Sequence, residues 1–217
     1  MLFSNRERLF DSLRFQSIIF FTYIAKTRSS DNETQRFICI LMILIGLLAV
    51  LPASAQTDVQ PPASGWFFIK SVQYGDSNAG YWDQPGTLKK YEKGANLMVY
   101  AHDSSFDCDQ QFRLISAGGD WYYIQSRNGG YVDVSKGESK NGTNVLIWEG
   151  TKRDNQKFRF QYLGDGRWIF FAANGGIVCL KGKSHEDRTN IHIWENHSGA
   201  FTEWYLRDSE TYKIWQP

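Results

Sequence analysis

Four side chains between residues 133 and 156 have the chemistry needed to hold a sugar ring. They are one carboxylate, one indole and two side-chain amides, namely Asp133, Trp148, Asn155 and Gln156. A pyranose has a face rich in C–H groups that packs on an aromatic ring, while its hydroxyls need paired donors and acceptors. A carboxylate accepts from two neighbouring hydroxyls, and an amide both donates and accepts. These residue types therefore indicate carbohydrate binding.

Each of these side chains also has a structural interpretation. Asp133 alternatively caps a turn, and Trp148 alternatively packs beneath a loop. Gln156 can bond to the backbone within its own turn, which leaves a ligand role for its neighbour. The sequence leaves both interpretations open.

Alternation along residues 145–148 predicts which side chains face the core. In an extended strand, Val145 and Ile147 share one face, while Leu146 and Trp148 share the other. The β-branched pair is the natural core face, so Trp148 is expected on the outer face. The same pattern, with an aliphatic pair inside and an aromatic outside, recurs in Leu97-Met98-Val99-Tyr100 and Ile191-His192-Ile193-Trp194.

These landmarks recur at a constant spacing along the chain. Phe112, Phe158 and Trp204 follow one another at intervals of 46 residues and are expected in the core of every copy. The same interval separates two further pairs, Trp148 with Trp194 and Asn128 with Asn174. Agreement among independent landmarks indicates three copies of one unit.

The repeat predicts an all-β fold. The copies are expected at residues 65–116, 117–163 and 164–208, each with about four short strands, and almost no helix is expected because no window has a helical period. A unit of roughly 46 residues is too small to bury a core alone. Closing three units around a threefold axis removes the free sheet edges and pools their apolar faces. The prediction is a β-trefoil.

The chain also resembles a known family, the ricin-type β-trefoil lectins, which carry a Gln-x-Trp motif in each repeat. The second copy is the most similar, through Tyr-Val-Asp-Val, Asn-Gly-Thr, Ile-Trp and Asn-Gln-x-Phe, and the resemblance covers residues 65–208. It implies sugar ligands at Asp133, Trp148, Asn155 and Gln156. Two departures stand out: Leu146 replaces a residue that is often polar, and Tyr131 and Gly150 occupy positions that often form a disulfide.

The other two copies match the site less well. The first supplies a weaker candidate site, Asp83, Tyr100, Asp109 and Gln110, with Met98 where a polar group is expected. In the third, Cys179 takes the Asp position and Thr202 the Gln position. A thiol cannot replace a bidentate carboxylate, so the third site is predicted to be inactive although Trp194 remains.

The first 55 residues are expected to be an N-terminal extension and secretory signal. An uncharged apolar run at 37–51 follows Arg36 and precedes Pro-Ala-Ser-Ala, which predicts cleavage after Ala55. The alternative, a membrane anchor, would need about 20 apolar residues. Residues 56–64 are expected to be a flexible leader, and 65–217 the β-trefoil domain.

Composition argues against several classes of function. After cleavage, 18 of the 24 Lys and Arg and 19 of the 23 Asp and Glu remain, so no electrostatic case exists for nucleic acid. Two remaining cysteines, Cys108 and Cys179, do not make a disulfide framework. Gly75-Asp76-Ser77 lacks the partners of a catalytic triad, and three histidines in the last copy lack metal-ligand spacing.

The sequence thus predicts a secreted, non-catalytic protein that binds glycans or polysaccharide, without cofactor or metal. No membrane association is expected after cleavage, and a partner domain would have to be a separate protein. The alternative is a β-trefoil that has lost sugar binding and acts through protein–protein contacts, as an inhibitor or adhesion factor; Leu146 and Met98 favour it because they make the outer face more apolar.

Overall fold

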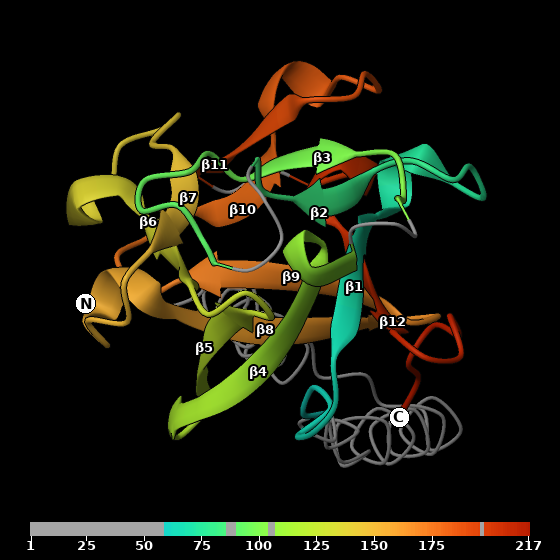
Figure 1. Cartoon of the computed structure of the whole chain (residues 1–217), viewed down its shortest axis with the longest axis horizontal. Helices are drawn as coiled ribbons and strands as arrows, with labels where there is room; N and C mark the ends of the chain where they lie inside the picture. Colours follow the sequence, from blue (N-terminus) through green and yellow to red (C-terminus); the bar gives the residue numbers. More distant parts are fainter. Residues whose placement is uncertain (1–58, 86–89, 104–106, 196–197) are drawn as a thin grey trace, which may run out of the picture. The chain divides into compact units, whose positions relative to one another are not determined.

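The computed structural model describes residues 59–85, 90–103, 107–195 and 198–217 (Figure 1). The predicted signal segment and the cleavage point after Ala55 lie outside these residues. Within the described ranges, no helix is long and apolar enough to cross a membrane.

The described chain consists of short strands and single 3-10 turns, four strands to each predicted repeat. The first repeat holds β1 (Phe67–Ser71), η1 (Val72–Tyr74), β2 (Tyr81–Asp83), β3 (Met98–Tyr100), η2 (Asp107–Asp109) and β4 (Gln111–Gly118). The second holds β5 (Trp121–Ser126), β6 (Tyr131–Val134), η3 (Ser135–Gly137), β7 (Val145–Trp148), η4 (Asp154–Gln156) and β8 (Lys157–Gly164). The third holds β9 (Arg167–Ala172), β10 (Ile177–Leu180), η5 (Lys181–Lys183), β11 (Thr189–Trp194), η6 (Ala200–Thr202) and β12 (Trp204–Asp208).

Six of the strands close into a barrel. The antiparallel neighbours run β1–β4–β5–β8–β9–β12 and return to β1, so the last strand of the third repeat pairs with the first strand of the first. Closure leaves none of these six strands as a free edge, which is the physical reason the three units need one another. The predicted β-trefoil is confirmed.

The remaining strands form three hairpins gathered at one end of the barrel, at the top of Figure 1: β2–β3, β6–β7 and β10–β11. Each hairpin also contacts the next. β3 pairs with β11, and isolated bridges join Asn96 to Leu146 and Asn144 to His192. The hairpins therefore form their own closed ring, which fixes the outer face where the predicted site lies.

The predicted core is confirmed. Phe112, Phe158 and Trp204 are fully buried, one from each repeat. The six aliphatic residues expected on the inner faces of the hairpins are also fully buried, namely Leu97, Val99, Val145, Ile147, Ile191 and Ile193. One outer-face expectation is wrong: His192 is only 6% exposed, because its strand bridges Asn144 and its ring lies 5.5 Å from that of Trp194.

β4 and β8 extend as far as Gly118 and Gly164, one or two residues past the expected repeat ends, and each has a register shift near its end. Part of the segment expected to be a flexible leader packs on the domain. Pro61 and Pro62 are buried, and Gln60 accepts a hydrogen bond of 2.9 Å from the Tyr122 hydroxyl. These apolar rings pack on the domain although the segment has no periodicity.

Candidate functional site

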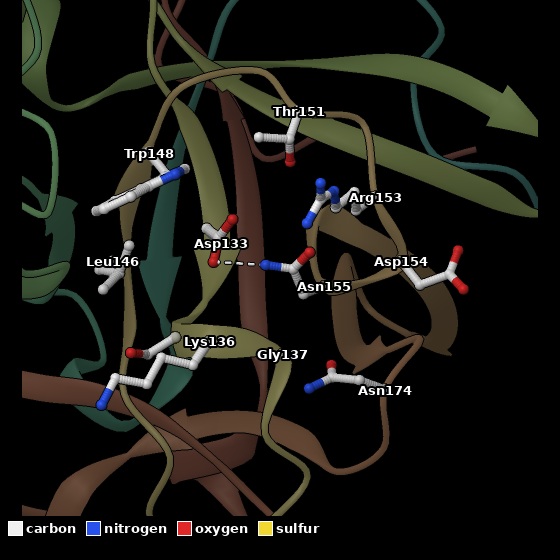
Figure 2. Close-up of a pocket in the computed structure, with 11 residues that line it drawn as sticks. Asp133, Lys136, Gly137, Leu146, Trp148, Thr151, Arg153, Asp154, Asn155 and Asn174 are labelled. Carbon is white, nitrogen blue, oxygen red and sulfur yellow. Dashed lines mark hydrogen bonds between the residues drawn. The ribbon is translucent and has the colours of Figure 1, made fainter.

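A pocket of about 630 Å³ opens beside the β6–β7 hairpin (Figure 2). Its lining comes from four places: the hairpin, the η3 turn that follows β6, the loop between β7 and η4, and the turn between β9 and β10 of the next repeat. The hairpin supplies Asp133, Leu146 and Trp148, and η3 supplies Ser135, Lys136 and Gly137. The loop after β7 and the η4 turn that ends it supply Thr151, Arg153, Asp154 and Asn155, and the turn between β9 and β10 supplies Asn174.

Asp133 lies at the centre of this lining and is held by two amides. Its side chain, 4% exposed, accepts from Asn155 Nδ2 at Oδ1 and from Gln156 Nε2 at Oδ2, each at 2.8 Å. Burial raises the pKa of Asp133, and the two amide donors partly oppose that rise. Because each carboxylate oxygen has two acceptor positions, both oxygens keep one for a ligand hydroxyl.

The structure places Gln156 beneath the pocket and not in its lining. The side chain is fully buried and donates to the Glu149 carbonyl at 2.7 Å as well as to Asp133. Its amide oxygen accepts from Lys152 N at 2.9 Å. With these three bonds Gln156 ties the β7–η4 loop to Asp133, which makes it a positioning residue.

Asn155 does line the pocket. Its Nδ2 donates to Asp133 and also to the Val134 carbonyl at 3.3 Å. No donor among the described residues reaches its Oδ1, so this oxygen can accept from a ligand.

Trp148 faces Asn155 from across Asp133 (Figure 2). The indole is half-buried, and Lys93 Nζ lies 4.4 Å from its centroid. Lys93 also pairs with Glu149 at 2.7 Å. The backbone of Gly94 passes close to the same ring, since a β-carbon there would lie 3.5 Å from Cζ3. A loop of the first repeat therefore fixes the aromatic wall of the second repeat's pocket.

Several lining residues were not predicted. Arg153, Lys136 and Asn174 line the pocket but are not among the site residues expected from the sequence. Leu146, which was expected beside the site, lines it as an apolar patch. Asn174 belongs to the third repeat and donates to the Glu138 carbonyl at 2.6 Å. It was used only as a spacing landmark, because sequence periodicity does not show that a turn of one repeat reaches the site of another.

The first repeat reproduces the central arrangement. Gln110 Nε2 donates to Asp83 Oδ2 at 2.7 Å and to the Ala101 carbonyl at 2.9 Å, while its oxygen accepts from Asp103 N at 3.2 Å. Burial raises the pKa of Asp83 to about 6, with a smaller contribution from Asp103. Met98 faces Asp83 across the hairpin.

The two remaining first-repeat candidates lie on neighbouring segments. Asp109 is buried within η2. The Tyr100 ring lies 5.8 Å from the Arg188 guanidinium, a residue of the third repeat's hairpin. The aromatic wall of the first repeat is thus also held by a loop from another repeat.

The third repeat lacks this chemistry. Cys179 faces His192 across the hairpin, and burial raises the pKa of its thiol to about 12, so the sulfur stays neutral. Thr202 is fully buried and donates to the Gly199 carbonyl at 2.8 Å. Among the residues that the structure describes, no cluster of three or more His, Cys, Asp or Glu could hold a metal ion.

Tyr131 and Gly150, the two positions that the family often bridges with a disulfide, are packed against each other. A β-carbon at Gly150 would lie 2.6 Å from Cε2 of Tyr131, so the tyrosine ring takes the space of the second side chain. In the first repeat the matching positions hold Tyr81 and His102, whose rings lie 5.2 Å apart. Cys108 and Cys179 are both free thiols.

Comparison with known proteins bears on the fold of the domain. Residues 59–148 match the family described as ricin-type β-trefoil lectin domain-like. This part of the chain is therefore similar to the ricin-type β-trefoil lectins. The matched segment ends at Trp148, so it spans the first repeat and the hairpin of the second.

Solved structures share the β-trefoil fold of this domain. The designed threefold-symmetric protein ThreeFoil is 25% identical, with a TM-score of 0.60 over 67% of this chain and 99% of its own. The Rhizoctonia solani agglutinin is 19% identical, with a TM-score of 0.57 over 70% and 99%. A Polyporus squamosus lectin, bound to a Neu5Ac-Gal-GlcNAc epitope, is 18% identical, with a TM-score of 0.55 over 69% and 50%. A search of curated proteins found no significant match.

Proposed function

We propose that this β-trefoil is a secreted, non-catalytic carbohydrate-binding protein with its main sugar site in the second repeat. One observation carries the proposal: Asp133 is held between Asn155 and Gln156 on the floor of a pocket whose wall is Trp148. A sugar ring would pack on the indole and donate hydroxyls to the carboxylate. The agglutinin and the lectin among the structural neighbours support this class of ligand.

The residues divide into contacts and supports. Asp133, Trp148 and Asn155 would touch the sugar, while Gln156 would hold the carboxylate in place. The first-repeat set would form a weaker site in which Gln110 supports Asp83 in the same way. Two modest sites bind usefully when one multivalent glycan engages both, since the second binding step is then intramolecular.

A glycan array tests the proposal. The protein should bind a defined set of glycans, and Asp133→Ala should abolish the second-repeat signal because the carboxylate is removed. Cys179→Ala is the matched control: it changes the equivalent position of the third repeat and should leave binding unchanged. An array with no bound glycan would contradict a sugar function, and an Asp133→Ala variant that binds as well as wild type would contradict a main sugar site in the second repeat.

The second candidate function is contact with a protein. The apolar Leu146 in the pocket lining favours it, because this side chain offers a sugar no hydrogen bond. A negative array would favour this candidate.

Secretion is tested separately. The exported protein should begin at Gln56 on N-terminal sequencing. An exported protein that keeps residues 37–51 would contradict cleavage.

A further inference from the structure

The pocket of the second repeat has two cationic side chains that take no part in the hydrogen bonds around Asp133. Arg153 and Lys136 are exposed and line the pocket. Neither side chain makes a hydrogen bond or ion pair with any residue in the described ranges. The pocket therefore offers positive charge that the folded chain leaves uncompensated.

The acidic residues nearest to Arg153 in the chain, Glu149 and Asp154, are each paired with a lysine. Asp154 Oδ1 binds Lys157 Nζ at 2.9 Å, and Glu149 Oε1 binds Lys93 Nζ at 2.7 Å. Arg153 stands directly beside Asp154 in the chain but takes no part in its pair. The negative groups near Arg153 are thus engaged elsewhere.

The direction of Arg153 is equally informative. In Figure 2 its guanidinium points into the pocket from the side opposite Trp148, whereas Asp154 points away. Asp133 lies between the two walls and is covered by its amide donors. A sugar packed on Trp148 and bonded to Asp133 would present its far edge to the guanidinium. A planar guanidinium forms two parallel bonds to a carboxylate or sulfate, and such charge-assisted bonds are stronger than bonds to a hydroxyl.

We infer that the second-repeat pocket selects sugars with an anionic substituent, a carboxylate or a sulfate ester, which Arg153 binds. The inference rests on the proposed sugar function and specifies its ligand class. Asp133 and Trp148 would bind the sugar ring, and Arg153 would favour sugars that carry a negative charge.

Matched saccharides give a direct test by NMR titration. The probes are methyl β-galactopyranoside, its 6-uronic acid and its 6-O-sulfate, with the same three compounds in the gluco series. In at least one series an anionic member should bind about tenfold more tightly than the neutral parent at low salt, as expected for one charge-assisted pair. The uronate and sulfate arms decide which anion is preferred. The preference should shrink with added salt, because the pair lies at an exposed wall.

Two variants assign the preference to Arg153. Arg153→Gln should bring the affinities for the anionic and neutral members to within about twofold of each other. Lys140→Gln removes the same charge from an exposed residue outside the pocket lining, and should keep the preference. Equal binding of neutral and anionic sugars by wild type, or equal effects of the two variants, would overturn the inference and leave the sugar function standing. Absence of binding to all six probes and to the array would overturn both.

Discussion

Two carboxylates, the half-buried Asp83 and the buried Asp133, show at the level of single residues why a glutamine recurs beside each candidate site. Each glutamine donates to the carboxylate and to a loop carbonyl, and accepts from a loop N–H. A buried carboxylate is costly unless hydrogen bonds compensate it. The glutamine therefore stabilises the charge and fixes the loop that carries the neighbouring ligand candidate.

This role predicts a large effect for Gln156→Ala. The change removes three hydrogen bonds and leaves buried groups unsatisfied, so the free energy of unfolding should fall by roughly 2–4 kcal/mol. The matched control is Thr202→Ala, which removes one hydrogen bond at the equivalent position and should cost about 1 kcal/mol. Urea unfolding of both variants measures the difference. Similar losses at the two positions would contradict a special role for the glutamine.

Protonation of Asp83 predicts a pH dependence. Its pKa of about 6 in the folded protein exceeds the usual value of roughly 4, so between these pH values the folded state binds more protons than the unfolded state. The free energy of unfolding should therefore fall as pH rises from about 4 to about 6. Asp83→Asn cannot titrate, so relative to wild type it should gain roughly 1–2 kcal/mol over this range, after discounting for solvent screening.

Urea unfolding of both proteins at several pH values checks this. Asp133 is present in both, so its own titration cancels in the comparison. Wild-type and Asp83→Asn stabilities that change in parallel with pH would show that Asp83 titrates normally.

The sequence predicted residues whose roles follow from type and spacing. The carboxylate, indole and amides of the second repeat were found because a hydrogen-bonding set and an aromatic recur in phase with the core. Three things could not be found in this way. Burial of Gln156 depends on the loop conformation, Asn174 arrives from another repeat, and the free charge of Arg153 depends on which neighbour pairs with Asp154.

At the scale of elements, each hairpin is built to support the next one. Gly94 lies against Trp148, and Arg188 lies over Tyr100. Gly142 lies against Trp194, since a β-carbon at Gly142 would be 3.7 Å from that ring. All three loop residues adopt positive φ, between 65° and 87°. The aromatic wall of each candidate site is thus set by a tight turn in a different repeat. Alternation within one strand predicts the outward aromatic, but cannot predict its support.

Packing of Tyr131 against Gly150 within the β6–β7 hairpin predicts a coupled pair of mutations. Gly150→Ala alone should destabilise by about 1–3 kcal/mol, because its β-carbon would overlap the Tyr131 ring. In a Tyr131→Ala background the same change should cost less than about 0.5 kcal/mol. A double-mutant cycle from urea unfolding measures this coupling. Additive effects would mean that the ring does not fill the position often bridged in the family.

At the scale of the whole domain, closure makes the repeats interdependent. β1 and β12 pair along their full lengths, and Phe112, Phe158 and Trp204 contribute to one core. A period of 46 residues was enough to predict this closure, since no single unit could bury these side chains. The packing of Pro61 and Pro62 was not predictable, because a leader without periodicity gives no signal for where it docks.

Interdependence predicts that a core change in any repeat lowers the stability of the whole domain in one transition. Three variants are mild enough to preserve folding: Phe112→Leu, Phe158→Leu and Trp204→Phe. Each should lower the free energy of unfolding by about 1–2 kcal/mol. Trp204→Phe also loses the 3.0 Å hydrogen bond from Nε1 to the Val178 carbonyl. Each variant should unfold in a single step with an unchanged denaturant slope, because the three repeats share one core. Following unfolding by both fluorescence and circular dichroism checks coincidence. Lys140→Gln, on the surface, should leave the midpoint unchanged. A second transition in the variant of any one repeat would show that this repeat unfolds alone, which would contradict a single shared core.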